Sequence, residues 1–344
     1  MYVVLVAHDF APSQGLSKLQ HSLEQRGHTV TSFLGFGKEI NAQEKTIDEH
    51  IRNANVLLAG MSSSRALAAE ELQAARIALH LHIPFGFYSD TYGTWNRPWL
   101  RPLSAQANFL FVLNEQDATL ARKSVKTGVR VVAAGNPLWE DFAHPTNGRT
   151  VTRKLLGLKE SDSMLLVAGT KELSVNMSLF AHTIEAAKKA KRKTEIFISL
   201  HPGDKNNPHT YKTLMGNRAS THLVLSHAWS GSALVPGANL VICSASTIGI
   251  EAAHQRIPVI NFFTKLSRKR LFEATGQTTW TPDELGASVM VYEDTAELTR
   301  EIIWLLTQKG RQEMQEKQKI IFPVIKRKGE VVRIMAETLL SIAS

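Results

Sequence analysis

The sequence predicts an α/β protein built from two doubly wound parallel sheets that follow one another along the chain. Three observations predict it. Short β-branched apolar runs alternate with helical stretches from the first residue, this pattern restarts after a polar interruption near residue 150, and the length is 344 residues. That length suits two domains of about 150 to 200 residues each. Because strands that alternate with helices pair in parallel, each half is expected to be Rossmann-like.

The first half contains six apolar runs that are typical of strands. We expect strands at 2–7, 29–36, 56–60, 85–88, 109–113 and 129–134, and helices at 16–27, 42–53, 66–81 and 115–126. Residues 11–15 (APSQG) are expected to form a turn before the first helix. Residues 143–150 (AHPTNGRT) combine proline, glycine and polar side chains, which predicts a linker after a first domain at 1–142.

The second half repeats the alternation. We expect strands at 164–168, 195–200, 223–226, 240–243, 259–262 and 288–292, and helices at 173–191, 247–254, 295–308 and 330–342, with a polar excursion at 203–220. These elements define a second domain at 151–325 and a C-terminal helix at 326–344 that packs back toward the first domain. Ligands of open α/β sheets bind beyond the carboxyl ends of the strands, so residues just after strands are the functional candidates, and paired domains turn these edges toward a shared cleft.

The composition excludes several classes of protein. Lysines and arginines number 40 against 31 aspartates and glutamates, which favours anionic partners. We expect no nucleic acid, since no zinc-finger spacing, RNP-like strand or helix-turn-helix signature is present. The single cysteine, Cys243, excludes an internal disulfide framework. No apolar run reaches the roughly 18 to 20 residues of a membrane span and the N-terminus lacks a signal-peptide pattern, so we expect a cytoplasmic protein.

The segment 243–263 (CSASTIGIEAAHQRIPVINFF) is the most informative part of the chain. Its strand leads into a Ser/Thr-rich turn that opens a helix. The hydroxyls of Ser244, Ser246 and Thr247, with the free N–H groups and positive dipole end of that helix, are typical of a phosphate site. Glu251 follows one turn later, where a carboxylate accepts hydrogen bonds from ribose hydroxyls. The alternative is an ordinary capped helix.

Three motifs resemble those of one family. Residues 244–260 are similar to an S-G-x-x-T-x-E-A…G-x-P-x-I signature, residues 135–138 (GNPL) with Asp141 to a G-N-P-L…D element, and residues 200–202 (LHP) to the H-P of a donor domain. The chain therefore resembles the glycosyltransferases of the type B fold and their sugar-nucleotide epimerase relatives. The likeness spans nearly the whole chain in architecture but only these motifs in sequence. It implies a role in cell-envelope polysaccharide synthesis.

The resemblance implies that the donor nucleotide binds to the second domain. Ser246 and Thr247 are then diphosphate contacts, and Glu251 is the acceptor for the ribose. Thr170 and Lys171 are further phosphate candidates, although a solvated first-turn lysine is the alternative for Lys171.

His201 is either a contact to the phosphate or base, or a packed structural residue.

The chain also departs from the family pattern. Ala245 and Ile257 stand where glycines are usual, and the glycine-rich loop after Ala168 is reduced to Gly169. Glycine permits backbone conformations that other residues rarely adopt, so we expect less backbone freedom in this phosphate loop.

Sugar transfer with inversion needs a base that deprotonates the acceptor. His8 and Asp9 follow the first strand, and an adjacent His/Asp pair suits proton abstraction near neutral pH; a polar cap for the next helix is the alternative. Asp90 is the rival, since its position resembles that of the catalytic acidic residue of lipid-A-disaccharide synthases.

No carboxylate pair has convincing DxD-like spacing, so we predict no metal and no cofactor besides the donor.

The segment 92–103 (YGTWNRPWLRPL) interleaves tryptophans with arginines. Exposed Trp95 and Trp99 beside Arg97 suit stacking on an acceptor sugar or docking at an anionic membrane, which would place the protein at the inner face of the membrane. The alternative is a packed loop that buries both indoles.

Three functions follow from these observations. The leading one is a glycosyltransferase that moves a sugar from a nucleoside diphosphate to a glycan or lipid-linked acceptor. The second is a non-hydrolysing UDP-GlcNAc 2-epimerase, which is disfavoured because the first domain offers few acidic residues beyond Asp9 and Asp90. The third is a non-catalytic binding protein that keeps the fold.

Overall fold

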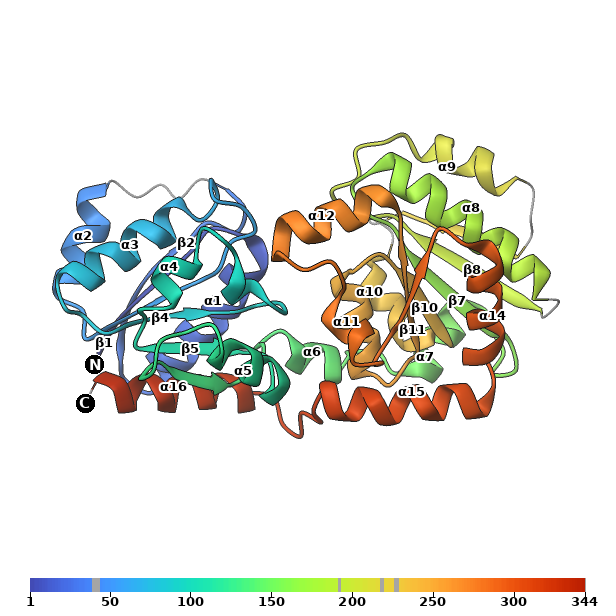
Figure 1. The fold of residues 1–344 in the computed structure, drawn as a ribbon. Helices are drawn as coiled ribbons and strands as arrows, with labels where there is room; N and C mark the ends of the chain where they lie inside the picture. The colour runs from blue at the N-terminus through green and yellow to red at the C-terminus, as the bar shows by residue number, and fades with distance from the viewer. Residues whose placement is uncertain (39–43, 191–192, 217–219, 226–228, 344) are drawn as a thin grey trace. The chain divides into compact units, whose positions relative to one another are not determined.

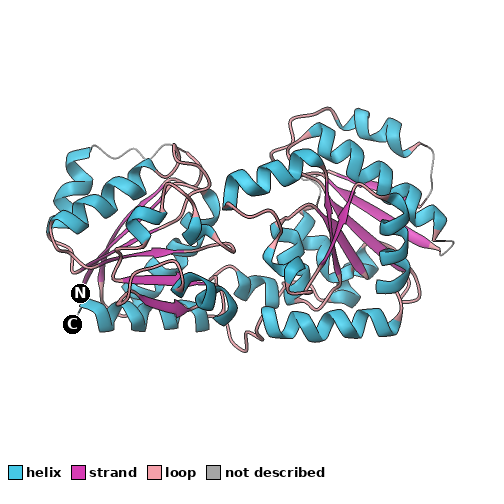
Figure 2. Ribbon diagram, in the orientation of Figure 1, coloured by secondary structure: helices cyan, strands magenta, loops and turns pink. Residues whose placement is uncertain are grey.

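The computed structural model describes residues 1–38, 44–190, 193–216, 220–225 and 229–343. The chain divides into two compact units. Unit 1 comprises Met1–Asp141, Phe272–Gln277 and Ile325–Ser344, and unit 2 comprises Phe142–Leu271 and Thr278–Val324. Each unit holds one sheet covered by helices on both faces (Figure 1 and Figure 2). The predicted α/β class with two doubly wound sheets is confirmed, while the shared cleft stays a prediction.

Unit 1 contains a six-stranded parallel sheet in the order β2-β1-β3-β4-β5-β6. Its strands are β1 (Tyr2–Ala7), β2 (Thr29–Leu34), β3 (Val56–Ala59), β4 (Phe85–Tyr88), β5 (Phe109–Val112) and β6 (Arg130–Ala133). The central strands β3, β4 and β5 are buried along their whole length. Burial on both faces explains why these strands are continuous apolar runs without polar alternation.

The helices of unit 1 cover both faces of this sheet. They are α1 (Phe10–Gln25), α2 (Glu44–Arg52), α3 (Ala69–His80), α4 (Arg101–Ser104), α5 (Glu115–Arg122), α6 (Trp139–Ala143, of which Phe142 and Ala143 belong to unit 2) and α16 (Glu330–Ala343). α16 packs beside α1 on a shared core that includes Leu16 and Met335. Glu140 fixes the start of α16, because its two carboxylate oxygens accept hydrogen bonds from the N–H groups of Gly329 and Val331 at 2.7 and 2.8 Å.

Unit 2 contains a second six-stranded parallel sheet in the order β12-β11-β10-β7-β8-β9. Its strands are β7 (Ser163–Ala168), β8 (Thr194–Ser199), β9 (Thr221–Val224), β10 (Leu240–Cys243), β11 (Val259–Phe263) and β12 (Val289–Tyr292). Its helices are α7 (Arg149–Leu155), α8 (Leu173–Lys189), α9 (Pro208–Met215), α10 (Gly231–Leu234), α11 (Thr247–His254), α13 (Thr281–Glu284), α14 (Thr295–Leu305) and α15 (Gln308–Ile321), with the first part of α12 (Lys265–Thr275).

Both sheets reverse their strand order beside their first strand. The reversal lies between β1 and β3 in unit 1 and between β7 and β10 in unit 2. At such a switch point the loops leave toward opposite faces of the sheet, and ligands of open α/β folds bind in the crevice between them. The loops at the unit 2 switch point are residues 169–172 and 244–246, and those at the unit 1 switch point begin at residues 8 and 60.

Several predicted elements differ from the structure. Residues 11–15 are not a turn, because α1 begins at Phe10 and accommodates Pro12 in its first turn, where a missing N–H group costs nothing. Residues 265–275, for which no element is predicted, are helical and form α12, and the polar excursion contains α9. The predicted helix 295–308 ends earlier, since Thr307 caps a separate helix, α15, by accepting a hydrogen bond from the N–H of Gly310 at 3.0 Å.

Some predicted residues lie outside the described part of the chain. They are the helix residues Ala42, Gln43 and Lys191, the strand residue Ser226 and residues 217–219 of the polar excursion.

Candidate functional site

The loop from β10 to α11 has the shape that a phosphate loop needs. Ala245 adopts a left-handed backbone conformation with φ of 47°. Its N–H group donates to Oδ1 of Asn261 at 3.2 Å, and Asn261 is held in turn by donating to Asp283 at 2.7 Å and to Ser288 at 3.1 Å. The loop therefore takes a conformation that favours glycine although the residue is alanine. The expected loss of backbone freedom does not prevent the turn from forming.

The turn before Pro258 also differs from the family pattern. Its left-handed residue is Arg256, with φ of 60°, whereas Ile257 is a buried side chain of ordinary backbone conformation. The glycine that Ile257 replaces is therefore not required for the backbone of this turn.

Hydroxyl and N–H groups gather at the N-terminus of α11. Ser246 is the N-cap residue, and its Oγ accepts a hydrogen bond from the N–H of Ile248 at 3.4 Å. Thr247 is the first residue of the helix. The Ser244 Oγ is buried and has no hydrogen-bond partner among the described residues. A buried hydroxyl without a partner is costly, so a ligand oxygen at this position would satisfy it.

Glu251 lies on the same helix and is only 4% exposed. Burial raises its pKa from 4.5 to about 7, and a hydrogen bond from Ser232 partly offsets that rise. Its Oε2 atom is buried without a partner among the residues that the structure describes. The carboxylate thus has one oxygen held by the protein and one free to accept a hydrogen bond from a ligand.

The other loop of this switch point, between β7 and α8, is held by an amide. Asn176 accepts hydrogen bonds at Oδ1 from the N–H of Thr170 at 2.7 Å and from its hydroxyl at 3.1 Å. The Thr170 Oγ1 also accepts from the N–H of Glu172 at 3.1 Å. Thr170 therefore shapes the loop, while the neighbouring Lys171 is exposed and its ammonium group is available to a phosphate.

His201 follows β8 near the same lysine. Its Nδ1 accepts a hydrogen bond from the N–H of Gly203 at 2.9 Å, which leaves the proton on Nε2. Burial and then the charge of Lys171 lower the pKa of His201 below its usual 6.5. The ring is therefore neutral at pH 7 and able to donate from Nε2, which fits both the ligand-contact and the packing interpretations.

The switch point of unit 1 brings together the predicted base candidates and one residue that the sequence did not indicate. Glu71, on α3, accepts hydrogen bonds from the N–H of His8 at 3.1 Å, from the N–H of Ser62 at 3.0 Å and from the Ser62 hydroxyl at 2.7 Å. Asp9 accepts from the N–H of Ser63 at 2.6 Å. Carboxylates thus hold the loops after β1 and β3 against each other.

Glu71 is fully buried, and burial raises its pKa to about 7 despite the hydrogen bonds that it accepts. The imidazole of His8 lies 3.4 Å from the carboxylate of Glu70. No motif indicated Glu71 or Glu70, because both lie in the first turn of an ordinary-looking helix. Only the proximity of the loop after β1 makes Glu71 part of this site.

Asp90 follows β4 and is a further carboxyl group of unit 1 with a raised pKa, besides Glu71 and Asp117. Burial raises the pKa of Asp90 to about 6, although the positive charge of Arg97 lowers it. Its Oδ1 has no hydrogen-bond partner within the described residues. Asn136, from the GNPL motif, donates to the backbone carbonyl of Asp90 at 2.8 Å. That motif therefore positions the loop that carries Asp90.

The interpretation of the tryptophan segment as an exposed contact surface is wrong for two of its three residues. Trp95 is buried, and its indole N–H donates to Asp117 at 2.8 Å. Arg97 is 3% exposed, and its guanidinium group donates to the carbonyl oxygens of Met61 and of Ala274, the latter at 2.7 Å. The packed-loop alternative, which buries both indoles, is correct for Trp95, and Arg97 is buried with it because the polar groups of both side chains find partners inside the unit.

Trp99 is partly buried and packs against the same core. Its indole N–H is also buried.

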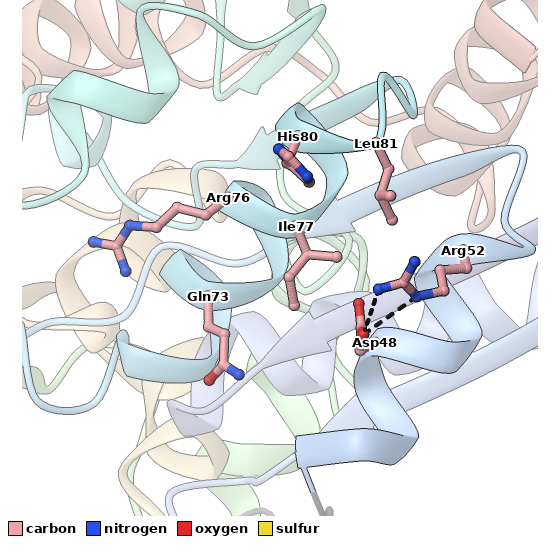
Figure 3. A pocket seen from close by; sticks show the side chains of 7 residues that line it. All are labelled: Asp48, Arg52, Gln73, Arg76, Ile77, His80 and Leu81. Atoms are coloured by element: carbon pink, nitrogen blue, oxygen red, sulfur yellow. Dashed lines mark hydrogen bonds and ion pairs between the residues drawn. The ribbon is translucent and has the colours of Figure 1, made fainter.

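A pocket of about 490 Å³ opens between α2 and α3 in unit 1 (Figure 3). Arg52 is paired there with Asp48 at 2.9 Å, and Arg76 and His80 lie on the facing helix. This pocket lies among helices that cover the sheet and not at the strand ends, and it contains none of the candidate residues. We assign it no part in the proposed activity.

No three His, Cys, Asp or Glu side chains in the part of the chain that the structure describes are grouped so as to hold a metal ion. No described helix is long and apolar enough to cross a membrane. A reaction without metal or cofactor stays a prediction.

Two tandem doubly wound units with these switch points define the type B glycosyltransferase fold, and the solved structures that resemble the chain have this fold. A UDP-GlcNAc 2-epimerase from Neisseria meningitidis bound to UDP-GlcNAc matches with a TM-score of 0.66 and 14% identity, over 99% of this chain and 100% of that one. A glycosyltransferase from Rickettsia africae matches with a TM-score of 0.65 and 14% identity, over 99% and 98%.

MurG from Acinetobacter baumannii is a third similar structure, with a TM-score of 0.64 and 12% identity over 99% of both chains. No protein-family model matches the sequence, and no curated protein matches it. At identities this low the likeness establishes the fold, and function has to be argued from the residues of the site.

Proposed function

We propose that the chain is an enzyme that binds a nucleoside diphosphate sugar on unit 2 and transfers the sugar to a glycan or lipid-linked acceptor. The observation that supports it most is the pairing of Glu251 with the N-terminus of α11. One helix presents a buried carboxylate with a free oxygen and, at its start, the unpartnered hydroxyl of Ser244. A nucleoside diphosphate needs both, because its ribose hydroxyls donate hydrogen bonds and its phosphates accept them.

Positively charged and dipolar groups in the loops of unit 2 are able to attract the diphosphate. Asn176 and Asn261 hold these loops, and both side chains are neutral amides. Asp204 and Asp283 lie one hydrogen bond behind these amides, which separates their carboxylates from the loop N–H groups. The dipole of α11 and the exposed ammonium group of Lys171 therefore remain available to the diphosphate. In the proposed reaction the same groups stabilise the nucleoside diphosphate as it leaves the sugar.

Unit 1 has the acid–base groups that the proposed reaction requires. For transfer with inversion, the acceptor hydroxyl gives its proton to a base while its oxygen bonds to the anomeric carbon, and the bond from that carbon to the phosphate oxygen breaks. Asp90 is our first candidate for this base, since a carboxyl group with a pKa of about 6 is mostly ionised at pH 7 and still basic enough to accept a proton. His8 and Asp9 stay as rivals.

A second candidate function is 2-epimerisation of a UDP-sugar. It requires acid–base groups that remove a proton from one face of the sugar and return one to the other. The sequence disfavoured it because acidic residues were few, but the structure adds buried Glu71 beside Asp9 in unit 1. Similar structures include UDP-GlcNAc 2-epimerases, among them one bound to UDP-GlcNAc.

Nucleotide binding is the first step to test. The chain is incubated with UDP-, GDP-, CDP- and ADP-sugars, and the midpoint of thermal unfolding is measured for each. We expect one nucleotide class to raise the midpoint, because a ligand that binds only the folded state stabilises it. The absence of a shift with every nucleotide would contradict both enzymatic functions.

The reaction type is tested next with UDP-GlcNAc, provided that it stabilises the protein. Conversion to the ManNAc epimer without an acceptor indicates epimerisation. Release of UDP that depends on an added glycan or lipid-linked acceptor indicates transfer. If UDP-GlcNAc binds but neither product forms, the third function, that of a non-catalytic binding protein, is favoured.

A further inference from the structure

A groove of about 460 Å³ lies in unit 2 at the edge of the sheet opposite to the nucleotide site. Its residues come from the start of α7, from the turn after α11 and from α15, and from the segments that enter β10 and β11. These strand starts are Asn239 and Pro258, whereas the proposed nucleotide site lies at the strand ends. The groove therefore belongs to a different place in the fold.

Three arginines line this groove, and none of its lining residues is acidic. Arg256 donates to the carbonyl oxygens of Phe322 at 2.7 Å and of Ala253 at 3.2 Å, so neutral groups fix its position and leave its charge in place. Gln315 supports it by donating to the carbonyl of Arg256 at 2.7 Å. The guanidinium group is thus oriented before any ligand arrives, which lowers the entropic cost of binding.

The other two arginines also retain excess charge. Arg149 lies 3.5 Å from Glu160, but the same carboxylate is 3.7 Å from Arg153, so one negative charge serves two arginines. Arg311, on α15, forms no ion pair among the residues that the structure describes. Burial lowers the pKa of Arg256, and burial followed by the charge of Arg153 lowers the pKa of Arg149. The lowered pKa values mean that burial disfavours the charged form of both arginines. An anion bound in the groove would stabilise that charged form.

Gln255 also lines the groove and has a buried amide donor. The Nε2 atom of Gln255 is buried and has no hydrogen-bond partner within the described ranges. A buried N–H group without an acceptor costs about 1 to 3 kcal/mol, and a ligand oxygen would remove that cost. Gln255 lies between α11 and Arg256, so the donor and the oriented charge are adjacent in the chain.

We propose that this groove, between Arg149, Arg256 and Arg311, is a second binding site that takes a phosphate ester. Guanidinium groups bind phosphate oxygens in bidentate fashion, and three of them around one groove suit a dianion. No aromatic side chain lines the groove, so it lacks the surface on which a nucleobase would stack. The apolar part of its lining, Ile257 with several prolines, suits the carbon skeleton of a small phosphorylated compound.

The first experiment reads the occupancy of the groove at one residue. The full chain is treated with phenylglyoxal, which modifies accessible arginines, with and without inorganic pyrophosphate, and the modified peptides are quantified by mass spectrometry. At a pyrophosphate concentration about ten times its dissociation constant, modification of Arg311 is expected to slow by about tenfold, because only the unoccupied groove reacts. Arg300, an exposed arginine on α14 outside the groove, serves as the internal control. Equal rates at Arg311 with and without pyrophosphate would overturn the proposal.

A second experiment uses variants and calorimetry with the same probe, in the presence of a saturating concentration of the nucleotide that stabilises the chain, so that the diphosphate site is filled. Arg311→Ala is expected to weaken pyrophosphate binding to the groove about tenfold, and Arg300→Ala to leave it unchanged. Arg311→Ala should also leave the nucleotide-induced rise in unfolding temperature unchanged, so a failure of the proposed function and a failure of this site are distinguishable. Equal binding by Arg311→Ala and the unaltered chain would contradict the assignment.

The source of the phosphate ester is decided by a third comparison. Vesicles of phosphatidylcholine with phosphatidic acid are sedimented with the chain and with Arg311→Ala. Sedimentation that the substitution abolishes indicates a lipid headgroup. Protection of Arg311 by pyrophosphate without sedimentation indicates a free metabolite. If neither pyrophosphate nor vesicles distinguish Arg311 from Arg300, there is no phosphate site in this groove.

Discussion

The switch points of the two units have the same topology but differ in the groups that accept hydrogen bonds from their loops. In unit 1 the N–H groups after β1 and β3 donate to carboxylates of the protein itself, Glu71 and Asp9. In unit 2 the corresponding N–H groups after β7 and β10 donate to the amides of Asn176 and Asn261. Carboxylates therefore accept directly from the loop N–H groups in unit 1. In unit 2 amides do so, and the carboxylates of Asp204 and Asp283 lie one hydrogen bond further away.

This difference affects which ligands each switch point is able to bind. Carboxylates in unit 1 satisfy the loop donors and repel a phosphate, and burial raises the pKa of one of them, Glu71, to about 7. Elsewhere in unit 1, burial raises the pKa values of Asp90 and Asp117 to about 6. Amides in unit 2 shape the loops without cancelling the helix dipole, so an anion is attracted. The comparison supports the proposal that unit 1 supplies the proton-transfer group and unit 2 binds the nucleotide.

The largest expected effect tests the assignment of proton transfer. Asp90→Asn should lower turnover by about 10² to 10⁴ while leaving donor-induced stabilisation unchanged, because a neutral amide accepts no proton. In the unaltered chain the rate should rise with pH through about 6, where Asp90 loses its proton. Product formation is measured from pH 5 to 8 in Asp90→Asn and His8→Ala. If only His8→Ala loses activity, His8 is the base.

The next effect tests the nucleotide site. Glu251→Ala should weaken nucleotide binding by about 10²-fold or more, because the ribose loses charge-assisted hydrogen bonds worth about 1.5 to 3 kcal/mol each. Calorimetric titration with the stabilising nucleotide measures it. Glu251→Gln is the matched control and should keep part of the affinity through its remaining oxygen. Unchanged binding by Glu251→Ala would show that the nucleotide site is elsewhere.

Removal of the internal anion of unit 1 should affect stability and not nucleotide binding. Glu71→Ala leaves the N–H groups of His8 and Ser62 buried without an acceptor, which should lower the free energy of unfolding by about 2 to 4 kcal/mol. The rise in unfolding temperature on nucleotide binding should persist. Loss of that rise in a folded Glu71→Ala variant would contradict the division of roles between the two switch points.

A smaller effect follows from the raised pKa of Glu251. Between about pH 4.5 and about 7 the folded state keeps a proton that the unfolded state releases, so the free energy of unfolding falls as pH rises through this window. Glu251→Gln has no proton to lose. Without ligand, its unfolding temperature relative to the unaltered chain should be about 2 to 4 °C higher at pH 8 than at pH 4. An equal difference at both pH values would contradict the burial of an uncompensated carboxylate.

The smallest effect tests the loop backbone. Ala245→Gly should stabilise the chain by about 0.5 kcal/mol, because relief of the left-handed conformation slightly exceeds the entropy that glycine adds to the unfolded state. Ala252→Gly, within α11, is the matched control and should destabilise by about 1 kcal/mol. Both are measured by thermal unfolding. A destabilised Ala245→Gly variant would show that the loop has another conformation.

The elements that the sequence predicted well are those with local causes. Continuous apolar runs predicted β1, β4 and β10 at the residues where the structure has them. A strand that is buried on both faces is apolar at nearly every position, without alternation of polar and apolar residues. The start of α11 at Thr247 was predicted because its cap, Ser246, is adjacent in the chain. The helices α9 and α12 were missed although each has a local cap, Asn207 followed by Pro208 for α9 and Thr264 for α12.

The residues that the sequence predicted poorly depend on distant partners. Arg97 was expected at a surface, but it is buried against the carbonyl of Ala274, which is 177 positions away. Glu71 had no local signal, and its function in the loops depends on His8, which is 63 positions away. Asn261 accepts a hydrogen bond from the N–H of Ala245, which is 16 positions away. It lies in β11, whose sequence indicated only a buried apolar strand.

The sequence by itself determined two doubly wound sheets, the order of their strands and helices along the chain, and the Ser/Thr-rich helix start with Glu251. These features follow from hydrophobic periodicity and capping, which act over a few residues. Only the tertiary structure decided which loops receive carboxylates and which receive amides. That choice depends on side chains that meet across a sheet, where burial sets both their pKa values and the donors that they satisfy.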